Sequence, residues 1–149
     1  MLRVRTLAAV TAAAASGILL LPSQAQAAGS VHLYKIYYDS PGTDNRSNSS
    51  LNAEYVQIRN TTGSAVNLRG WTLTDAANHK YTFGNFPLGA GKIVTVRTGR
   101  GTNTAANIYQ NRAAYVWNND KDTATLRKSN GSTVDTCAYN STRVDYKWC

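Results

Sequence analysis

The chain has 149 residues, and its 16 Lys and Arg against 8 Asp and Glu give a net charge of +8. This length fits one domain with an ordinary hydrophobic core, and the sequence shows no internal repeat, coiled-coil heptad or low-complexity tract, which excludes repeat and coiled-coil architectures. A chain this basic is drawn to anionic polymers such as DNA, wall polyanions or lipid headgroups, although the charge is equally consistent with solubility alone.

The first 27 residues predict a secretory signal peptide. Arg3 and Arg5 precede the apolar run Leu7–Leu21, and Ala25-Gln26-Ala27 has the small-x-small pattern of a cleavage site. The run is about 15 residues, which is short for a membrane span, so a membrane anchor is the less favoured alternative. Cleavage after this triplet leaves residues 28–149 with a net charge of +6. We therefore expect one secreted domain without stable membrane insertion, and the Ala-rich signal is typical of bacteria.

Both cysteines, Cys137 and Cys149, lie in the mature part. An even count in an exported chain predicts a disulfide. A metal site built on these cysteines is disfavoured, because the sequence offers only two further soft ligands, His32 and His79. The bridge would hold the C-terminal tail and contribute on the order of 3 kcal/mol.

The mature chain reads as short strands between turn signals, which predicts an all-β sandwich or barrel. In Ala53–Asn60, Val56 and Ile58 point inward, while Tyr55, Gln57 and Arg59 point outward. In the expected strand over residues 31–38 the alternation slips midway, which indicates a bulge. The other expected segments are Val66–Leu68, Trp71–Asp75, Lys80–Phe83, Lys92–Thr98, Tyr115–Trp117, Thr123–Arg127 and Ser132–Tyr139.

The last of these strands has a defined parity. We expect Val134 to face the core and Asp135, Cys137 and Tyr139 to face outward, which would place the disulfide on the outer side of the sheet. Two polar segments, Asp39–Asn52 and Gly99–Ala114, are expected to be loops.

The order of several short motifs resembles the lamin tail domain family. The most specific part is Val66–Asp75, with its Gly-Trp-x-Leu-x-Asp spacing, after the strand Glu54–Asn60. The resemblance covers most of residues 31–139, and its further motifs are Tyr81-Thr82-Phe83, Leu88-Gly89-Ala90-Gly91, Trp117-Asn118-Asn119, Asp122–Arg127 and Asn130–Asp135.

The resemblance implies an immunoglobulin-like β-sandwich and a family of non-catalytic modules. In nuclear lamins the domain contacts proteins and DNA, and in bacteria similar domains occur in exported proteins, often beside hydrolases. The export signal excludes the nuclear-filament role. The resemblance thus defines the fold more closely than the function.

The sequence contains few candidates for catalysis. His32 and His79 lie outside any catalytic motif, and Asp120 with Asp122 is best interpreted as a turn in which Asn and Asp side chains bond to their own backbone. We expect no enzyme activity and no cofactor.

Glu54 shares the inward parity of Val56, so its carboxylate needs a buried partner. The alternatives are backbone N–H groups of the Asp39–Asn52 loop, Arg69, or a calcium ion shared with Asp39, Asp44 and the carbonyls of Asn45 or Asn48. Calcium needs six to eight oxygens, but the spacing matches no EF-hand and Arg46 places a positive charge within the loop. The loop is therefore expected to hold Glu54 by hydrogen bonds, and no metal ligands are assigned.

A basic loop, in the segment Lys92–Arg112, is the candidate binding site. Its cations are accompanied by one aromatic ring, and Gly99-Arg100-Gly101 would let the backbone approach a partner closely. The alternative is a solvated loop, with Arg59 and Arg97 only protecting a sheet edge. The candidate binding residues are Lys92, Arg97, Arg100, Tyr109 and Arg112.

These observations predict a secreted, non-catalytic binding module that adheres to an anionic polymer, either extracellular DNA or the cell wall. The alternative is a subunit that docks on an exported protein, or on a second copy of itself, through the face that carries Tyr55, Gln57 and Arg59. A small secreted hydrolase is the weaker alternative.

Overall fold

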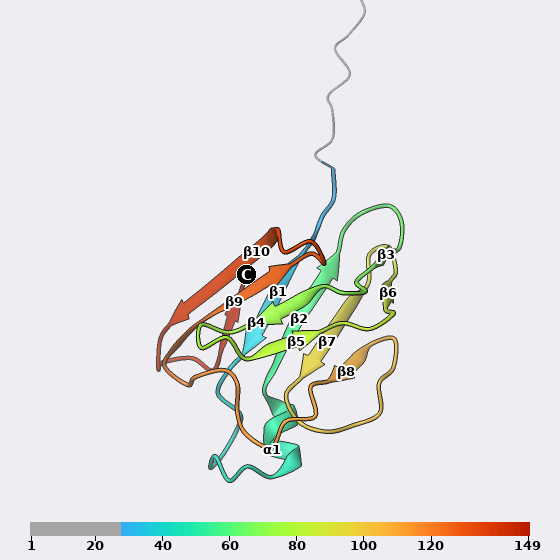
Figure 1. Cartoon of the computed structure of the whole chain (residues 1–149). Helices are drawn as coiled ribbons and strands as arrows, with labels where there is room; N and C mark the ends of the chain where they lie inside the picture. The colour runs from blue at the N-terminus through green and yellow to red at the C-terminus, as the bar shows by residue number, and fades with distance from the viewer. Residues whose placement is uncertain (1–27) are drawn as a thin grey trace, which may run out of the picture.

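The computed structural model describes residues 28–149, so the expected signal peptide, residues 1–27, lies outside the described residues. The elements in chain order are β1 (Val31–Tyr37), α1 (Asn48–Ala53), β2 (Tyr55–Asn60), β3 (Val66–Asn67), β4 (Thr72–Thr74), β5 (Lys80–Thr82), β6 (Pro87–Leu88), β7 (Ile93–Arg97), β8 (Asn107–Tyr109), β9 (Lys121–Arg127), β10 (Thr133–Asn140) and β11 (Tyr146–Trp148). They confirm the expected all-β class (Figure 1).

Two packed sheets form the sandwich. The first has the order β11-β1-β2-β7-β8, the second has the order β10-β9-β4-β5, and β3 and β6 form a small separate pair. Neighbouring strands are antiparallel except for β7 and β8, which are parallel. We call the first layer the five-stranded sheet and the second the four-stranded sheet.

Alternating side chains build the core between the sheets. Val56 and Ile58 are fully buried, while Tyr55, Gln57 and Arg59 on the other face of β2 remain partly exposed, which confirms the expected alternation. The largest fully buried apolar and aromatic side chains come from both layers and their connections: Leu33, Ile36, Tyr38, Leu68, Leu73, Leu88, Ile108, Trp117 and Leu126.

β1 contains the expected bulge. The register with β2 shifts between Leu33, which pairs with Ile58, and Lys35, which pairs with Gln57. Tyr34 is the extra residue, and a bulge sets two residues of one strand against one of its neighbour. Tyr34 and Lys35 therefore both lie on the outer face of the five-stranded sheet, while the apolar residues on either side return to the core.

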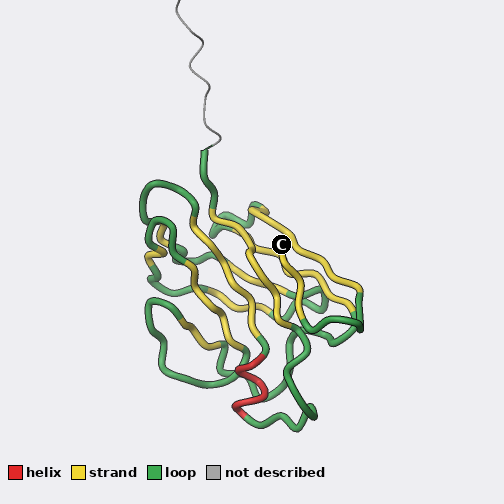
Figure 2. Tube along the Cα trace, turned by 180° about the vertical axis from the view of Figure 1, so that it is seen from behind, coloured by secondary structure: helices red, strands yellow, loops and turns green. Residues whose placement is uncertain are grey.

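Four elements, α1, β6, β8 and β11, lie in segments that were expected to be loops or were not assigned, and the expected segment Tyr115–Trp117 forms no strand. α1 starts after Ser47, near the end of the Asp39–Asn52 segment, and buries Leu51; it includes Ala53, which was expected to begin the following strand. Figure 2 shows this helix at the end of the sandwich opposite to the point where residue 28 enters. β8 forms inside the Gly99–Ala114 segment, and β11 forms in the tail. Among residues 28–149, no helix has the length and apolar character needed to cross a membrane.

In the last long strand Val134 packs against the core as expected, but the orientation expected from Asp135 onward is wrong. Cys137 and Tyr139 are buried, and the Tyr139 ring stacks on Tyr38 with centroids 3.8 Å apart. A register shift between Thr133 and Asp135 explains the error, because a bulge turns every following side chain to the opposite face.

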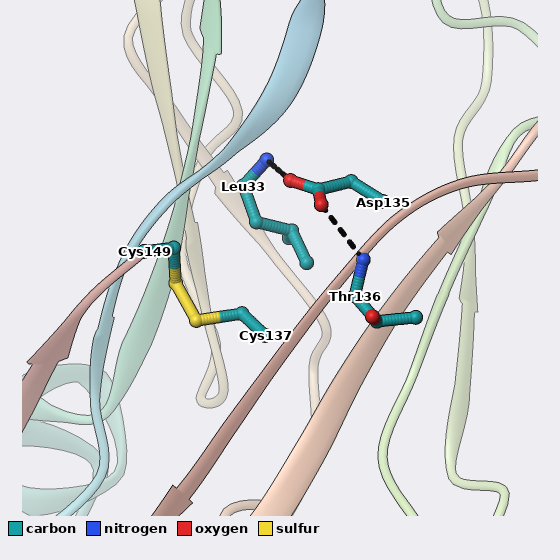
Figure 3. Close-up of a disulfide and its surroundings, with 5 residues drawn as sticks. All are labelled: Leu33, Asp135, Thr136, Cys137 and Cys149. Atoms are coloured by element: carbon teal, nitrogen blue, oxygen red, sulfur yellow. Dashed lines mark hydrogen bonds between the residues drawn. A yellow bond between two sulfur atoms is a disulfide. The ribbon is translucent and has the colours of Figure 1, made fainter.

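The disulfide between Cys137 and Cys149 therefore joins the two sheets. Cys137 belongs to β10, and Cys149 directly follows β11 in the five-stranded sheet (Figure 3). Asp135 makes a second link, because its Oδ2 accepts a hydrogen bond from the Leu33 backbone N–H at 2.9 Å.

Glu54 connects three parts of the chain inside the core. The side chain is fully buried, and its Oε2 accepts hydrogen bonds from Thr98 Oγ1 at 2.5 Å and Val116 N at 3.1 Å. Its Oε1 accepts one from Trp117 N at 2.7 Å. The inward orientation was predicted, but the donors come from residues 98, 116 and 117 and not from the 39–52 loop.

Burial raises the pKa of Glu54 to about 7, against the three hydrogen bonds, which lower it. Below pH about 4.5 the carboxyl group is protonated in the folded and unfolded chains, and above pH about 7 it is ionised in both. The folded state binds the proton more tightly, so the stability that Glu54 contributes is complete at low pH and is lost as the pH rises through this window.

We expect the free energy of unfolding of the native protein to fall by about 3 kcal/mol relative to the Glu54→Gln variant between pH 4.5 and pH 7. The variant keeps a neutral side chain across this range, so it lacks this contribution. Urea unfolding of both proteins across the window measures the difference. Parallel pH profiles would contradict a raised pKa at Glu54.

Replacing Cys137 and Cys149 together by Ser should lower the free energy of unfolding by on the order of 3 kcal/mol. It should also release β11, because that strand pairs with β1 through three residues only. Amide hydrogen exchange at residues 146–149 should accelerate, while exchange in β9 serves as the internal reference. Unchanged protection of residues 146–149 would show that the strand is held without the bridge.

Candidate functional site: an aromatic and cationic sheet face

The outer face of the five-stranded sheet carries a row of four tyrosines and one arginine. Tyr37 of β1 pairs with Tyr146 of β11 on one side and with Tyr55 of β2 on the other. Arg97 of β7 pairs with Tyr55 and with Tyr109 of β8. Neighbouring strands lie about 4.8 Å apart, so this aromatic row crosses all five strands over about 19 Å.

A second row lies beside the aromatic row. Lys35 pairs with Trp148 and with Gln57, and Thr95 pairs with Gln57 and with Asn107. Gln57 Nε2 donates a hydrogen bond to Thr95 Oγ1 at 3.3 Å. The cationic and aromatic side chains of this row thus lie over β11 and β1, and its amide and hydroxyl groups lie over β2, β7 and β8.

Lys35 is the centre of the aromatic cluster on β1 and β11. Its Nζ lies 4.5 Å from the ring centroids of both Tyr146 and Trp148, and 5.6 Å from that of Tyr37. The Trp148 ring also meets Tyr34 edge-on at 5.2 Å. The electrostatic attraction between the ammonium group and the ring faces holds this cluster in place.

Two arginines repeat this arrangement. The Arg59 guanidinium lies 5.4 Å from the centroid of Tyr34, and that of Arg97 lies 5.5 Å from the centroid of Tyr55. Arg97 also donates hydrogen bonds to Asn107 Oδ1 and to the carbonyl of the last asparagine in α1, both at 2.8 Å. β2 and β7 are interior strands, so the expectation that these arginines protect a sheet edge is wrong.

The face remains open to a partner at its β11 side. Trp148 is 53% exposed and Tyr146 is 40% exposed, and together with Val144 they are the large hydrophobic side chains that residues 28–149 expose. Aromatic side chains of this kind are enriched where proteins bind their partners.

Within the described residues, no carboxylate lies within ion-pair distance of the cations of this face. The five strands contain no Asp or Glu. Within residues 28–149, the ion pair closer than 4 Å joins His79 and Asp75, outside this sheet. Asp145 and Asp39 lie near the Tyr37 end, where burial and then the Asp145 charge raise the pKa of the Tyr37 hydroxyl.

The structure separates the five predicted binding residues. Arg97 and Tyr109 join the aromatic row, whereas Lys92 lies just before the opposite end of β7. Arg100 is exposed beyond the sheet, and Arg112 Nη2 donates to the Lys80 carbonyl of the four-stranded sheet at 3.2 Å. These five residues do not form one cluster.

The binding residues predicted from the sequence did not include Tyr34, Lys35, Tyr37, Tyr146 and Trp148. The alternation of aromatic residues in VHLYKIY and YKW was the available signal. This signal did not show that the two segments lie side by side, because the pairing of the tail with β1 is a tertiary contact.

The close approach expected at Gly99 and Gly101 occurs within the molecule. A Cβ on Gly99 would lie 2.7 Å from Oδ1 of both Asn48 and Asn52, and one on Gly101 would lie 2.5 Å from the Tyr109 ring. Both asparagines also donate through Nδ2 to the carbonyl of the residue between the glycines. These glycines thus allow the loop to pack on α1 and on the aromatic row.

The residues considered for calcium have other contacts. Glu54 is held in the core, and Asp44 Oδ2 accepts a hydrogen bond from Asn119 Nδ2 at 2.8 Å. Within residues 28–149, no group of three or more His, Cys, Asp or Glu side chains is arranged to hold a metal ion. Glu54 therefore does not meet Asp39 and Asp44 at a shared site.

The acidic and histidine candidates make structural contacts. Asp122 is buried and accepts hydrogen bonds from the backbone N–H groups of Ala76, Asn118 and Thr123, which fits the turn interpretation. His79 Nδ1 lies 2.6 Å from Asp75 Oδ2. A pocket of about 620 Å³ beside Asp122 is lined by neither histidine.

Comparison with known families agrees with this architecture. The family model described as Lamin Tail Domain matches residues 24–141. No curated protein matches the chain. The family consists of non-catalytic, immunoglobulin-like domains that act in binding and protein interaction, and the two packed sheets have this fold. Because the match covers well over half of its length, the chain belongs to the lamin tail domain family.

Proposed function

We propose that this protein is a secreted, non-catalytic binding module that adheres to an anionic polymer, extracellular DNA or the cell wall, through the outer face of the five-stranded sheet. The observation that carries the proposal is the aromatic row together with Lys35 and Arg59, whose cations lie over ring faces and lack carboxylate partners. The proposed binding site is thus a sheet face. Arg97 and Tyr109, two of the binding residues predicted from the sequence, lie at its β7–β8 side.

The physical chemistry of the face favours a long anionic ligand. Cations without a counter-charge attract polyanions over distances of about a Debye length, and binding releases the counterions of the polymer. The rings add contact area on rigid side chains, which lose little conformational entropy on binding. A flat face about 19 Å wide suits an extended chain better than a small molecule.

Secretion is supported by two features of the chain. The first 27 residues have the charged start, apolar run and small-x-small site of an export signal. The disulfide between Cys137 and Cys149 requires an oxidising compartment to persist. The mature domain, residues 28–149, would then act outside the cell, and the signal is of the bacterial type.

A protein partner is the second candidate, and the exposed apolar side chains Val144, Tyr146 and Trp148 favour it. An exported enzyme or a second copy of this chain would cover them. Size-exclusion chromatography of the protein alone and with fractionated culture fluid distinguishes this candidate from polymer binding.

Replacing Lys35 and Arg59 together by Ala should weaken binding to DNA and to purified cell wall and should lower the magnitude of the salt slope by roughly 2. Co-sedimentation at low and moderate salt, with calcium or with chelator, measures both quantities. Circular dichroism of the variant verifies the fold.

The matched control is the Arg100→Ala, Arg112→Ala double variant, which removes the same charge outside the face. Its binding should stay close to that of the native protein. If this control loses binding while the Lys35 and Arg59 variant does not, the basic loop is the site. If neither variant loses binding, the polymer binds at another surface of the domain. If the native protein binds neither polymer, a protein partner is the better account.

A further inference from the structure

Each cation of the outer face lies beside at least one ring. Lys35 of β1 lies over Trp148 and Tyr146 of β11, Arg59 of β2 lies over Tyr34 of β1, and Arg97 of β7 lies over Tyr55 of β2. Each cation is 4.5–5.6 Å from its ring centroid. The face thus presents positive charges on three adjacent strands, each next to an aromatic ring.

This pattern discriminates among anionic polymers. Wall polyanions built from phosphodiesters of polyols offer charge without a ring. Neutral glycans offer sugar faces without charge. Duplex DNA carries charge, but its bases are stacked inside the helix and show only their edges in the grooves. A single-stranded nucleic acid repeats one phosphate and one accessible flat base per unit, and proteins bind it through cationic surfaces with aromatic stacking platforms.

Building on the proposed function, we propose that the ligand of this face is single-stranded nucleic acid, with its bases stacked on exposed rings such as Trp148 and its phosphates on Lys35 and Arg59. A face about 19 Å wide accommodates several nucleotides. Asp39 and Asp145 lie near the Tyr37 end and repel phosphates there. The backbone of the ligand therefore runs over the second row, on the Lys35 side of the rings.

The side chains present predict little sequence preference. Gln57 and Asn107 are the amides of the second row, and each already has a hydrogen-bond partner on the sheet. Stacking then dominates recognition, and it tolerates any base because every base has a flat face.

Trp148 provides the test. It is 53% exposed, whereas Trp71 and Trp117 are buried, so quenching of the tryptophan emission reports on this face. The oxidised protein is titrated with a dT oligonucleotide, a DNA hairpin duplex, inorganic polyphosphate and a neutral glucan. The dT oligonucleotide should quench the emission and bind at least tenfold more tightly than the duplex or polyphosphate.

Variants separate stacking from charge. Trp148→Leu keeps an apolar side chain without a ring and should weaken dT binding on the order of tenfold, measured by anisotropy of a labelled oligonucleotide. Val144→Ala removes exposed apolar area from the same segment outside the rows and should leave the affinity unchanged. Amide exchange of β11 in both variants verifies that the strand remains docked.

The outcomes are distinct. Equal or tighter binding of duplex or polyphosphate, or dT binding that Trp148→Leu leaves unchanged, overturns the single-strand assignment while the proposed adhesion to anionic polymers stands. Binding of the neutral glucan alone, or of none of the four ligands, overturns both. Preferential dT binding that depends on Trp148 supports the inference.

Discussion

The buried carboxyl group of Glu54 fixes the relation between the core and the outer face. Glu54 and Thr98 meet inside the sandwich, and their neighbours in sequence, Tyr55 and Arg97, pair on the outside. Side chains alternate between the two faces of a strand. The hydrogen bond that holds Glu54 and Thr98 inward therefore directs their neighbours outward, where they pair. Glu54 also accepts hydrogen bonds from the backbone N–H groups of Val116 and Trp117, in the segment that leads into β9. These two bonds link the two sheets at the same point.

The other half of the face depends on an irregularity and a covalent bond. The β1 bulge directs both Tyr34 and Lys35 outward, and the bond between Cys137 and Cys149 holds β11 so that Tyr146 and Trp148 lie beside them. A three-residue strand at the end of a chain is prone to fray. The covalent link and the Asp135 contact thus maintain part of the candidate binding surface.

The cations and rings of the outer face contact one another, and the Tyr146 and Trp148 rings remain partly exposed. Cation–π contacts fix long side chains before any ligand arrives, which lowers the conformational entropy lost on binding. A rigid sheet also holds the spacing of the rings. Such an open face is better suited to repeated weak contacts with a polymer than to catalysis, which needs a convergent, enclosed site.

The sequence by itself determined the strand alternation of Tyr55–Asn60, the bulge near Tyr34, the inward Glu54 and the family, because these depend on local periodicity and on the order of short motifs. Only the tertiary structure decided which donors meet Glu54, that Cys137 faces the core, and that Trp148 lies beside Lys35. These facts depend on register and on pairing between distant segments, and a shift of one residue in a strand reverses the face of every side chain that follows.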